Sequence, residues 1–398
     1  MQGLVNKYRS LLQVVPTAFE RTLTQKIDWS ARAICIAGAR GTGKSTLVLQ
    51  YIKKNLPPAQ TLYASLDDLH FRQHTLTETA EEFYLNGGRF LFLDEVHKYD
   101  NWEREVKNLY DFYPEIKIVV SGSSILALRH AEADLSRRML FYLLPELSLR
   151  EYIALSEKII LPVISLDELL INHQDFVDSI KKDLPAPLAL YNDYLTYGAY
   201  PFFTEGKGSY LMRINQLINV IIDYDLPETR RIEISTQAKL KKLLYIISTS
   251  VPFTPNIAKL AEQMETSRIR LLEMLDMLER AQLIYNLRSA TKGISLMNKP
   301  QKIFLHNTSL IAALADGTPN IGNLRETFLF TQLTGANHQV NHPKKGDFIV
   351  DQKMLIEVGG RNKSRDQIQT AHDAWLAVDN IEYGTNRRMP LWSFGFLY

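Results

Sequence analysis

A glycine-rich segment near the N-terminus carries the residue types that hold phosphate groups. Residues 38–45, GARGTGKS, match the pattern G-x-x-x-x-G-K-[ST] at every fixed position. Glycine permits tight backbone turns and close approaches that a Cβ atom would obstruct, and the loop N–H groups and the N-terminus of the following helix then face the anion. Lys44 is expected to reach the β- and γ-phosphates of a nucleotide, and the Ser45 hydroxyl to bind Mg²⁺. We call residues 38–45 the P-loop. The residues expected to contact the nucleotide are Gly38, Gly41, Thr42, Gly43, Lys44, Ser45 and Thr46.

An apolar run that ends in two acids follows further along the chain. Phe90–Leu93 has the composition of a buried central strand, and Asp94 and Glu95 stand at its carboxyl end. Open α/β sheets bind their ligands at the carboxyl ends of the strands. Asp94 is therefore expected to hold Mg²⁺, directly or through water, and Glu95 to polarise the attacking water. The alternative is a solvated strand end that carries two surface acids.

Two further polar segments are candidates for contact with the γ-phosphate. The apolar run Ile118–Val120 ends in small polar residues, of which Ser121 and Ser123 are candidate sensors of the nucleotide state. Serines at such positions also form ordinary turns and helix caps. Arg137 and Arg138 precede the next apolar run, and either is a candidate arginine finger, acting within the chain or from a neighbouring subunit. The alternative for both arginines is a solvated surface position.

Length and composition are those of a globular protein with several hydrophobic cores. The 398 residues predict about two to three domains, and 45% hydrophobic with 23% charged residues exclude a disordered or low-complexity chain. The net charge of +2 indicates no strong overall field for nucleic acid or membrane. The single cysteine, Cys35, lies in an apolar run and is expected to be a small buried residue in a reducing compartment. The sequence shows no signal peptide or membrane-spanning stretch, so we expect a cytoplasmic protein without a membrane partner.

Residues 31–145 alternate short apolar runs with helical stretches. Apolar runs separated by helices of this length predict parallel strands joined by crossovers, and hence an α/β sheet covered by helices on both faces. The predicted strands are Ala33–Ala37, Thr61–Ser65, Phe90–Leu93, Lys117–Ser121 and Met139–Leu143. Residues 1–30 have the spacing of one or two amphipathic helices, residues 146–230 are mostly helical, and residues 300–398 mix short strands with helices.

Two helical segments after residue 255 have the order of a helix–turn–helix. Residues 256–264 and 268–279 are separated by Glu265–Ser267, and a candidate wing strand follows them. In a winged helix the second helix enters the major groove of DNA, where Arg268 and Arg270 would make contact. Acids on the two helices oppose this prediction because they would repel phosphate. The alternative is a module that binds another protein. The lysines that add positive charge on the preceding helix are Lys239, Lys241 and Lys242.

The order of these motifs resembles a large prokaryotic family of AAA+-like ATPases whose C-terminal domain is related to restriction endonucleases. The P-loop, the acid pair and the serine-rich strand end are followed by Leu144–Tyr152, which is similar to the family pattern L-P-L-S-F-x-E. Arg138 falls on the family's arginine, and Arg137 replaces its glycine. Tyr194–Pro201 and Pro390–Tyr398 also resemble family signatures, so the likeness runs through the whole chain. It implies an ATPase that uses ATP and Mg²⁺.

The resemblance also implies a restriction-endonuclease-like core near the C-terminus. Its paired strands correspond to Gly346–Val350 and Leu355–Gly359. In such a core Asp347 and Glu357 would hold Mg²⁺. Glu326 is a candidate third carboxylate, and its alternative is a solvated surface acid.

One residue departs from the nuclease pattern. Gly359 occupies the place of the lysine that orients or deprotonates water, and Lys363, four residues on, is a candidate substitute. Without that lysine we expect a nuclease-derived fold that serves binding or packing rather than an active nuclease.

Together these observations predict an α/β chain with a P-loop parallel sheet covered by helices, then a helical lid, a winged-helix unit and a small α/β nuclease-like domain. The predicted boundaries are 1–145, 146–230, 231–298 and 299–398.

The predicted function is the hydrolysis of Mg-ATP by a molecular switch, with DNA and a second copy of the chain as candidate partners. One alternative is an ATP-gated nuclease, and another is a nucleotide-bound regulator or DNA-binding adaptor that does not hydrolyse ATP. The predicted catalytic residues are Lys44, Glu95 and Arg138, the predicted metal ligands are Ser45 and Asp94, and Ser123 is the predicted γ-phosphate contact.

Overall fold

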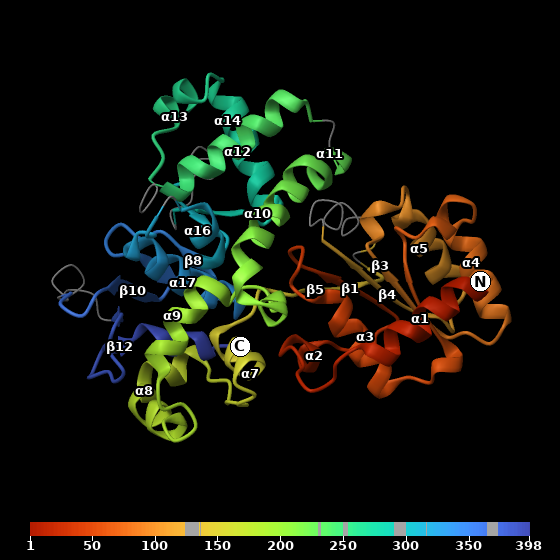
Figure 1. Ribbon diagram of the computed structural model, residues 1–398, viewed down its shortest axis with the longest axis horizontal. Coiled ribbons are helices and arrows are strands. Elements are labelled where there is room, and N and C mark those ends of the chain that lie inside the picture. The colour runs from red at the N-terminus through yellow and green to blue at the C-terminus, as the bar shows by residue number, and fades with distance from the viewer. Residues whose placement is uncertain are drawn as a thin grey trace. The chain divides into compact units, whose positions relative to one another are not determined.

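The computed structural model (Figure 1) divides into two compact units. Unit 1 is Met1–Pro145 and unit 2 is Glu146–Tyr398. The division of unit 2 into a lid, a winged helix and a nuclease-like domain stays a prediction. The structure describes residues 1–123, 135, 137–229, 232–249, 254–289, 300–315, 317–363 and 373–398.

The sheet of unit 1 confirms the predicted parallel α/β fold. Its order is β2-β3-β4-β1-β5, and every neighbouring pair is parallel. Because the strands run in one direction, the P-loop after β1, the acids after β3 and the serines after β4 emerge at the same edge. The strands are β1 (Ala33–Ala37), β2 (Thr61–Ser65), β3 (Phe90–Asp94), β4 (Lys117–Gly122) and β5 (Leu140–Leu143).

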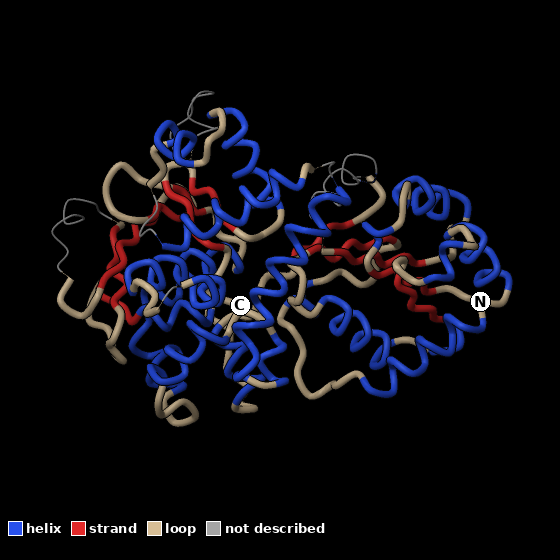
Figure 2. Tube along the Cα trace, turned by 45° about the horizontal axis from the view of Figure 1, so that its top comes forward, coloured by secondary structure: helices blue, strands red, loops and turns tan. Residues whose placement is uncertain are grey.

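Helices pack on both faces of this sheet (Figure 2). Successive side chains of a strand point to opposite faces. Ile34 and Ile36 therefore join the core beneath α3, whereas Cys35 joins the core beneath α4 and α5. Cys35 is a buried free thiol, as the apolar run predicts. The α-helices in the described part of unit 1 are α1 (Gln2–Val14), α2 (Leu23–Lys26), α3 (Lys44–Asn55), α4 (Leu76–Leu85) and α5 (Trp102–Phe112).

Unit 2 contains a mixed sheet in the order β12-β11-β10-β9-β8. β10 pairs antiparallel with β9 and parallel with β11, so the predicted pairing of the two C-terminal strands is confirmed. The strands are β8 (Val340–Asn341), β9 (Phe348–Val350), β10 (Met354–Gly359), β11 (Ala374–Val378) and β12 (Arg388–Pro390).

Helices make up most of the remainder of unit 2. They are α7 (Leu149–Ser156), α8 (Leu166–Ile180), α9 (Pro187–Tyr197), α10 (Tyr210–Val220), α11 (Leu226–Thr229), α12 (Ile234–Thr249), α13 (Ile257–Gln263), α14 (Arg268–Arg280), α16 (Thr308–Leu314) and α17 (Ile321–Gly335). β6 (Ile284–Leu287) and β7 (Lys302–Leu305) form a two-stranded antiparallel sheet.

Two of the family-like signatures contact each other inside unit 2. Ser148 caps α7 together with Glu151, and Ser148 Oγ donates to the Tyr398 carbonyl at 2.7 Å. Arg150 Nε donates to the same carbonyl at 3.0 Å, and Tyr398 Oη donates to the Glu146 carbonyl at 3.1 Å. These signatures therefore have a packing role, because they hold the C-terminal residue against the start of α7.

The predicted helix–turn–helix corresponds to α13 and α14. Asn256 and Ser267 cap the two helices by accepting the backbone N–H of Lys259 and Arg270, each at 3.2 Å. The assignment of a winged helix to this region stays a prediction.

No helix in the part of the chain that the structure describes combines the length and the apolar character needed to cross a membrane.

Candidate functional site

The P-loop connects β1 to α3 through glycines in the left-handed region. Gly41 has φ = 84° and Gly43 has φ = 92°, and α3 begins directly after Gly43. Glycine adopts these angles without a steric penalty. Lys44 Nζ donates to the Gly38 and Ala39 carbonyls at 2.9 Å each, and the lysine is only 5% exposed. The loop thus curves around the ammonium group that is predicted to meet the phosphates.

The other predicted contact residues of the motif lie in the same loop and the first turn of α3. Thr42 is buried, and its Oγ1 donates to the Ala39 carbonyl at 2.9 Å. Ser45 is half-buried, and Thr46 is exposed beside it.

Asp94 joins the P-loop to the neighbouring strands. Oδ2 of its buried carboxylate accepts hydrogen bonds from Ser45 Oγ and Tyr63 Oη, both with an O–O distance of 2.5 Å. On Oδ1 it accepts from Ser121 Oγ at 2.5 Å and from the Glu95 N–H at 2.9 Å. Asp94 is 3% exposed, so the alternative of a surface acid is wrong for this residue. The Ser45 hydroxyl and the Asp94 carboxylate are oxygen donors of the kind that Mg²⁺ takes, and they lie together.

Tyr63 is a member of this site that sequence reasoning missed. Burial raises the pKa of its hydroxyl well above the usual range, and the nearby Asp94 carboxylate raises it further. Tyr63 therefore remains a proton donor to Asp94. A tyrosine within an otherwise apolar strand was the available signal, because a buried tyrosine hydroxyl needs a hydrogen-bond partner.

Glu95 and Ser123 are linked through a second missed residue, His97. His97 Nε2 lies 3.4 Å from Glu95 Oε2 and 3.3 Å from Ser123 Oγ. The His97 side chain is fully buried, whereas that of Glu95 is 30% exposed. Glu95 has φ = 51°, a conformation that costs energy in residues other than glycine and clusters at functional sites. The predicted sensor therefore hydrogen-bonds the same imidazole nitrogen that lies close to the predicted base.

Arg138 lies away from the P-loop of its own chain. Its Nε and Nη2 bond the two carboxylate oxygens of Asp111 at 2.9 and 3.0 Å, and these bonds lower the pKa of Asp111. Arg138 precedes β5, which runs parallel to β1, with Leu140 paired to Ile34. It therefore stands at the amino end of the sheet, opposite the edge that carries the P-loop. A role as an arginine finger for a neighbouring subunit stays a prediction.

A second cluster of charged side chains lies in unit 2. Lys302 Nζ is 3.0 Å from Glu326 Oε2 and 3.3 Å from Asp347 Oδ1. Asp347 Oδ2 accepts the Val358 N–H at 2.9 Å, which places Asp347 beside Glu357 of β10. The Glu326 side chain is 13% exposed, so the alternative of a solvated surface acid is wrong.

Lys363 fills the space above Gly359. A Cβ atom on Gly359 would lie 2.4 Å from Lys363 Cγ and 2.5 Å from Lys363 Cβ. Lys363 Nζ is 2.8 Å from Glu357 Oε1. The side chain of Lys363 thus takes the room that a lysine side chain at residue 359 would need, and its ammonium group reaches the strand carboxylate.

Two lysines, Lys302 and Lys363, pair with the three carboxylates of this cluster. Burial raises the pKa of Glu326, and the Asp347 carboxylate raises it further, whereas Lys302 opposes the shift. The hydrogen bond to Glu357 raises the pKa of Lys363. Among the described residues, no group of three His, Cys, Asp or Glu side chains is arranged to hold a metal ion. The cluster is a set of ion pairs, with Lys302 between two of the carboxylates.

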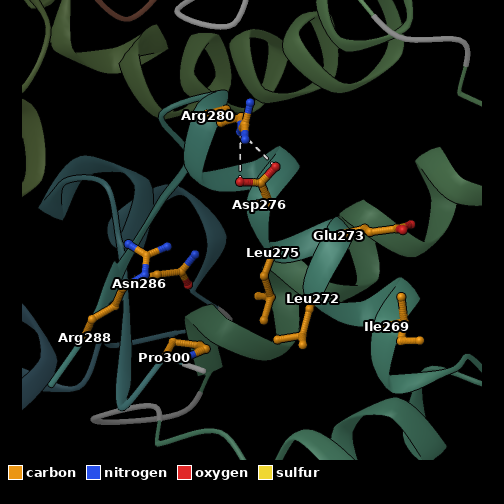
Figure 3. A pocket seen from close by; sticks show the side chains of 9 residues that line it. All are labelled: Ile269, Leu272, Glu273, Leu275, Asp276, Arg280, Asn286, Arg288 and Pro300. Atoms are coloured by element: carbon orange, nitrogen blue, oxygen red, sulfur yellow. Dashed lines mark hydrogen bonds and ion pairs between the residues drawn. The ribbon is translucent and has the colours of Figure 1, made fainter. Parts of the chain in front are cut away.

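The exposed side of α14 borders a pocket of about 390 Å³ (Figure 3). The helix carries three arginines and three acids, and Arg280 pairs with Asp276 at 2.8 Å. Arg268 and Arg270 are exposed in the first turn, where Arg270 pairs with Glu273 at 3.2 Å. The face is therefore mixed in charge, and DNA binding stays a prediction. The residues that line the pocket are Ile269, Leu272, Glu273, Leu275, Asp276, Arg280, Asn286, Arg288 and Pro300.

Comparisons with known proteins bear most directly on unit 1. Residues 30–153 match the family model of an AAA domain, and residues 188–320 match a domain of unknown function (DUF8612). Unit 1 has the fold of a P-loop ATPase. The AAA match supports nucleotide binding and hydrolysis by this unit.

Individual proteins are similar to larger parts of the chain. An uncharacterized protein of Methanocaldococcus jannaschii is 29% identical over 383 residues, covering 88% of this chain and 80% of the relative. Among solved structures, a Walker-type ATPase of Pyrococcus abyssi is 11% identical with a TM-score of 0.43, over 76% of this chain and 99% of that one. AMPPCP-bound DnaA from Aquifex aeolicus is 16% identical with a TM-score of 0.25, over 68% of this chain and 85% of that one.

The raised pKa of Glu326 predicts a pH-dependent stability difference. Between the ordinary glutamate pKa and the raised value, the folded chain holds a proton that the unfolded chain has released. Wild-type stability should therefore fall, relative to Glu326→Gln, as pH rises from the ordinary glutamate pKa through the raised value. Urea unfolding across this range measures the difference. Glu262→Gln, at an exposed position in the same unit, is the control, and parallel pH profiles for wild type and Glu326→Gln would contradict the prediction.

Proposed function

We propose that unit 1 binds Mg-ATP at the P-loop and hydrolyses it, and that the hydrolysis cycle acts as a molecular switch for unit 2. The observation that carries this proposal is the direct hydrogen bond from Ser45 Oγ to the buried carboxylate of Asp94 at 2.5 Å. It joins the P-loop to the acidic strand end in the arrangement that phosphoryl transfer needs.

Each residue has a separate task in this reaction. The P-loop N–H groups and the Lys44 ammonium bind the phosphate oxygens. Ser45 and Asp94 would hold Mg²⁺, which when bound offsets the negative charge of the phosphates. Glu95 orients the water that attacks the γ-phosphorus and accepts its proton, while the bond to the β,γ-bridging oxygen breaks and ADP leaves with that electron pair.

The γ-phosphate can be sensed through Ser123. Ser123 Oγ and Glu95 Oε2 both lie near His97 Nε2, at 3.3 and 3.4 Å. When the Ser123 hydroxyl donates a hydrogen bond to a γ-phosphate oxygen, the serine oxygen can accept a hydrogen bond from His97 Nε2. His97 then does not compete for Glu95, and the Glu95 carboxylate is available to the attacking water. This order of contacts would link recognition of ATP to its hydrolysis.

Partners of the switch are proposed from two observations. Arg268 and Arg270 are exposed in the first turn of α14 and are the proposed contacts to DNA. Arg138 faces away from its own P-loop, so an arginine finger at this position requires a second copy of the chain.

Substitution of Lys44 and of Glu95 separates binding from hydrolysis. Lys44→Ala should weaken ATP binding by at least about tenfold, because it removes the cation that meets the phosphates. Glu95→Gln should bind ATP normally but lower turnover by about 10²-fold or more, because the amide cannot accept the proton. Calorimetric ATP binding and phosphate release, measured with and without duplex and single-stranded DNA and with molecular mass in parallel, test both.

Lys54→Ala, on the same helix as Lys44, is the matched control and should change neither quantity. Equal turnover by Glu95→Gln and wild type would contradict the role of Glu95. Tight ATP binding by wild type without turnover, alone or with DNA, would favour a non-hydrolysing regulator.

A second candidate function is metal-dependent cleavage of phosphodiester bonds in unit 2. The position of Lys363 favours it, because the ammonium group is 2.8 Å from Glu357 Oε1 in the space left by Gly359. Glu357 Oε2 is buried and has no hydrogen-bond partner among the described residues, so a cation there would satisfy it. Glu357 and Asp347 would hold the metal, which when bound would polarise the phosphodiester. The ion pairs of Lys302 compete with such a metal.

Cleavage of DNA in Mg²⁺ or Mn²⁺ tests this second candidate. Wild type should nick supercoiled plasmid or cut single-stranded DNA, and Lys363→Met should lower the rate by about 10²-fold, as expected for loss of a group that positions or deprotonates water. Lys353→Met, at an exposed position between β9 and β10, is the matched control. If wild type cuts neither substrate, or if Lys363→Met cuts at the wild-type rate, this candidate is wrong.

A further inference from the structure

Arg21 is a buried arginine that contacts both the P-loop and the last residue of unit 1. It is 5% exposed. Its Nη1 donates to the Thr42 carbonyl at 2.6 Å, and its Nη2 donates to the Pro145 carbonyl at 2.7 Å. A guanidinium group is planar and rigid, so two carbonyls bound by its two Nη atoms are held at a fixed separation. Charge-assisted bonds of this kind are also stronger than neutral ones.

The chain segment that carries Arg21 is fixed along α3. Gln50 Nε2 donates to the Pro16 carbonyl at 2.6 Å and to the Phe19 carbonyl at 2.8 Å. Further along the segment, Trp29 stacks on Tyr51 with ring centroids 3.6 Å apart. The backbone segment that carries the Arg21 guanidinium group is therefore anchored to α3, the helix that follows the P-loop.

Residues 144–145 also touch the beginning of the P-loop directly. The Leu144 N–H donates to the Ala37 carbonyl at 2.8 Å. A Cβ atom on Gly38 would lie 2.5 Å from the Leu144 carbonyl oxygen, so the two backbones approach closely. Arg21 adds a connection from Thr42, further along the loop, to Pro145. The start and the middle of the P-loop are thus tied to the segment that leads out of unit 1.

We infer that Arg21 is a positioning residue that couples nucleotide occupancy of the P-loop to the position of Leu144–Pro145, the connection to unit 2. In a phosphate-binding loop the N–H groups turn toward the anion. Arg21 holds the carbonyl of Thr42, so a change in the loop backbone on nucleotide binding moves the acceptor of Nη1. The rigid fork transmits that movement to Pro145. This inference rests on the proposed binding of ATP. It adds a route by which a structural change at the P-loop reaches the connection to unit 2.

Hydrogen–deuterium exchange with and without Mg-AMPPNP tests the coupling. In wild type, the nucleotide should slow exchange both in the P-loop and in a peptide covering residues 139–150, each by about threefold or more. In Arg21→Gln, protection of the P-loop should persist while protection of residues 139–150 is lost. Arg21→Lys keeps the charge but has a single ammonium group in place of the fork, and it should also lose protection of residues 139–150.

Arg9→Gln, at an exposed position of α1, is the matched control and should retain both effects. Calorimetric AMPPNP binding and thermal unfolding of each variant accompany the exchange data, and Arg21→Lys serves as the test variant if Arg21→Gln does not fold. Wild-type protection of residues 139–150 in both Arg21 variants overturns the coupling and leaves the proposed ATP binding intact. Loss of AMPPNP binding in both folded variants also overturns it, because Arg21 would then act in binding itself. Absence of AMPPNP binding by wild type contradicts the proposed function.

Discussion

The buried carboxylate of Asp94 is the interaction on which the proposed site depends. A carboxylate that is 3% exposed must be met by hydrogen-bond donors, because an unpaired buried charge is costly. The hydroxyls of Ser45, Tyr63 and Ser121 and the N–H of Glu95 meet it. These donors come from the P-loop helix, from the two strands beside β3 and from the next residue of the chain. One charge therefore aligns four segments at the edge of the sheet where a nucleotide would bind.

This arrangement is also compatible with the proposed switch. A hydroxyl group can rotate, so the bond from Ser45 to Asp94 can be exchanged for a bond to a metal without movement of the backbone. The Ser123 hydroxyl can likewise rotate and exchange its hydrogen bond with His97 for one to a phosphate oxygen. Arg21 differs from both because it holds backbone carbonyls, including that of Thr42. The nucleotide would therefore act on rotating side chains within the site and on the backbone where the P-loop meets the end of unit 1.

The parts of this fold that local sequence determines could be predicted, and the parts that depend on tertiary register could not. Apolar runs and helical spacing are local, so the five strands of unit 1 and the placement of the P-loop followed from the sequence. Tyr63 reaches Asp94 only because β2 lies beside β3, and no local pattern reports that pairing. His97 lies in the short 3-10 helix Val96–Lys98 and Arg21 in a loop, and tertiary packing sets the path of both segments. The sequence position of Lys363 makes it a candidate substitute for the missing lysine, but only the folded backbone after β10 shows that its side chain occupies the space above Gly359.

Asp94 is proposed to act on nucleotide binding through Mg²⁺. The most direct test is the affinity for ATP of wild type and Asp94→Asn, measured by calorimetry once in Mg²⁺ and once in EDTA. The substitution keeps the shape of the side chain and removes its charge. Asp94→Asn should bind ATP about tenfold or more weakly than wild type in Mg²⁺ and equally well in EDTA, because the loss acts through the metal. An equal loss of affinity in both conditions, or full affinity in Mg²⁺, would contradict it.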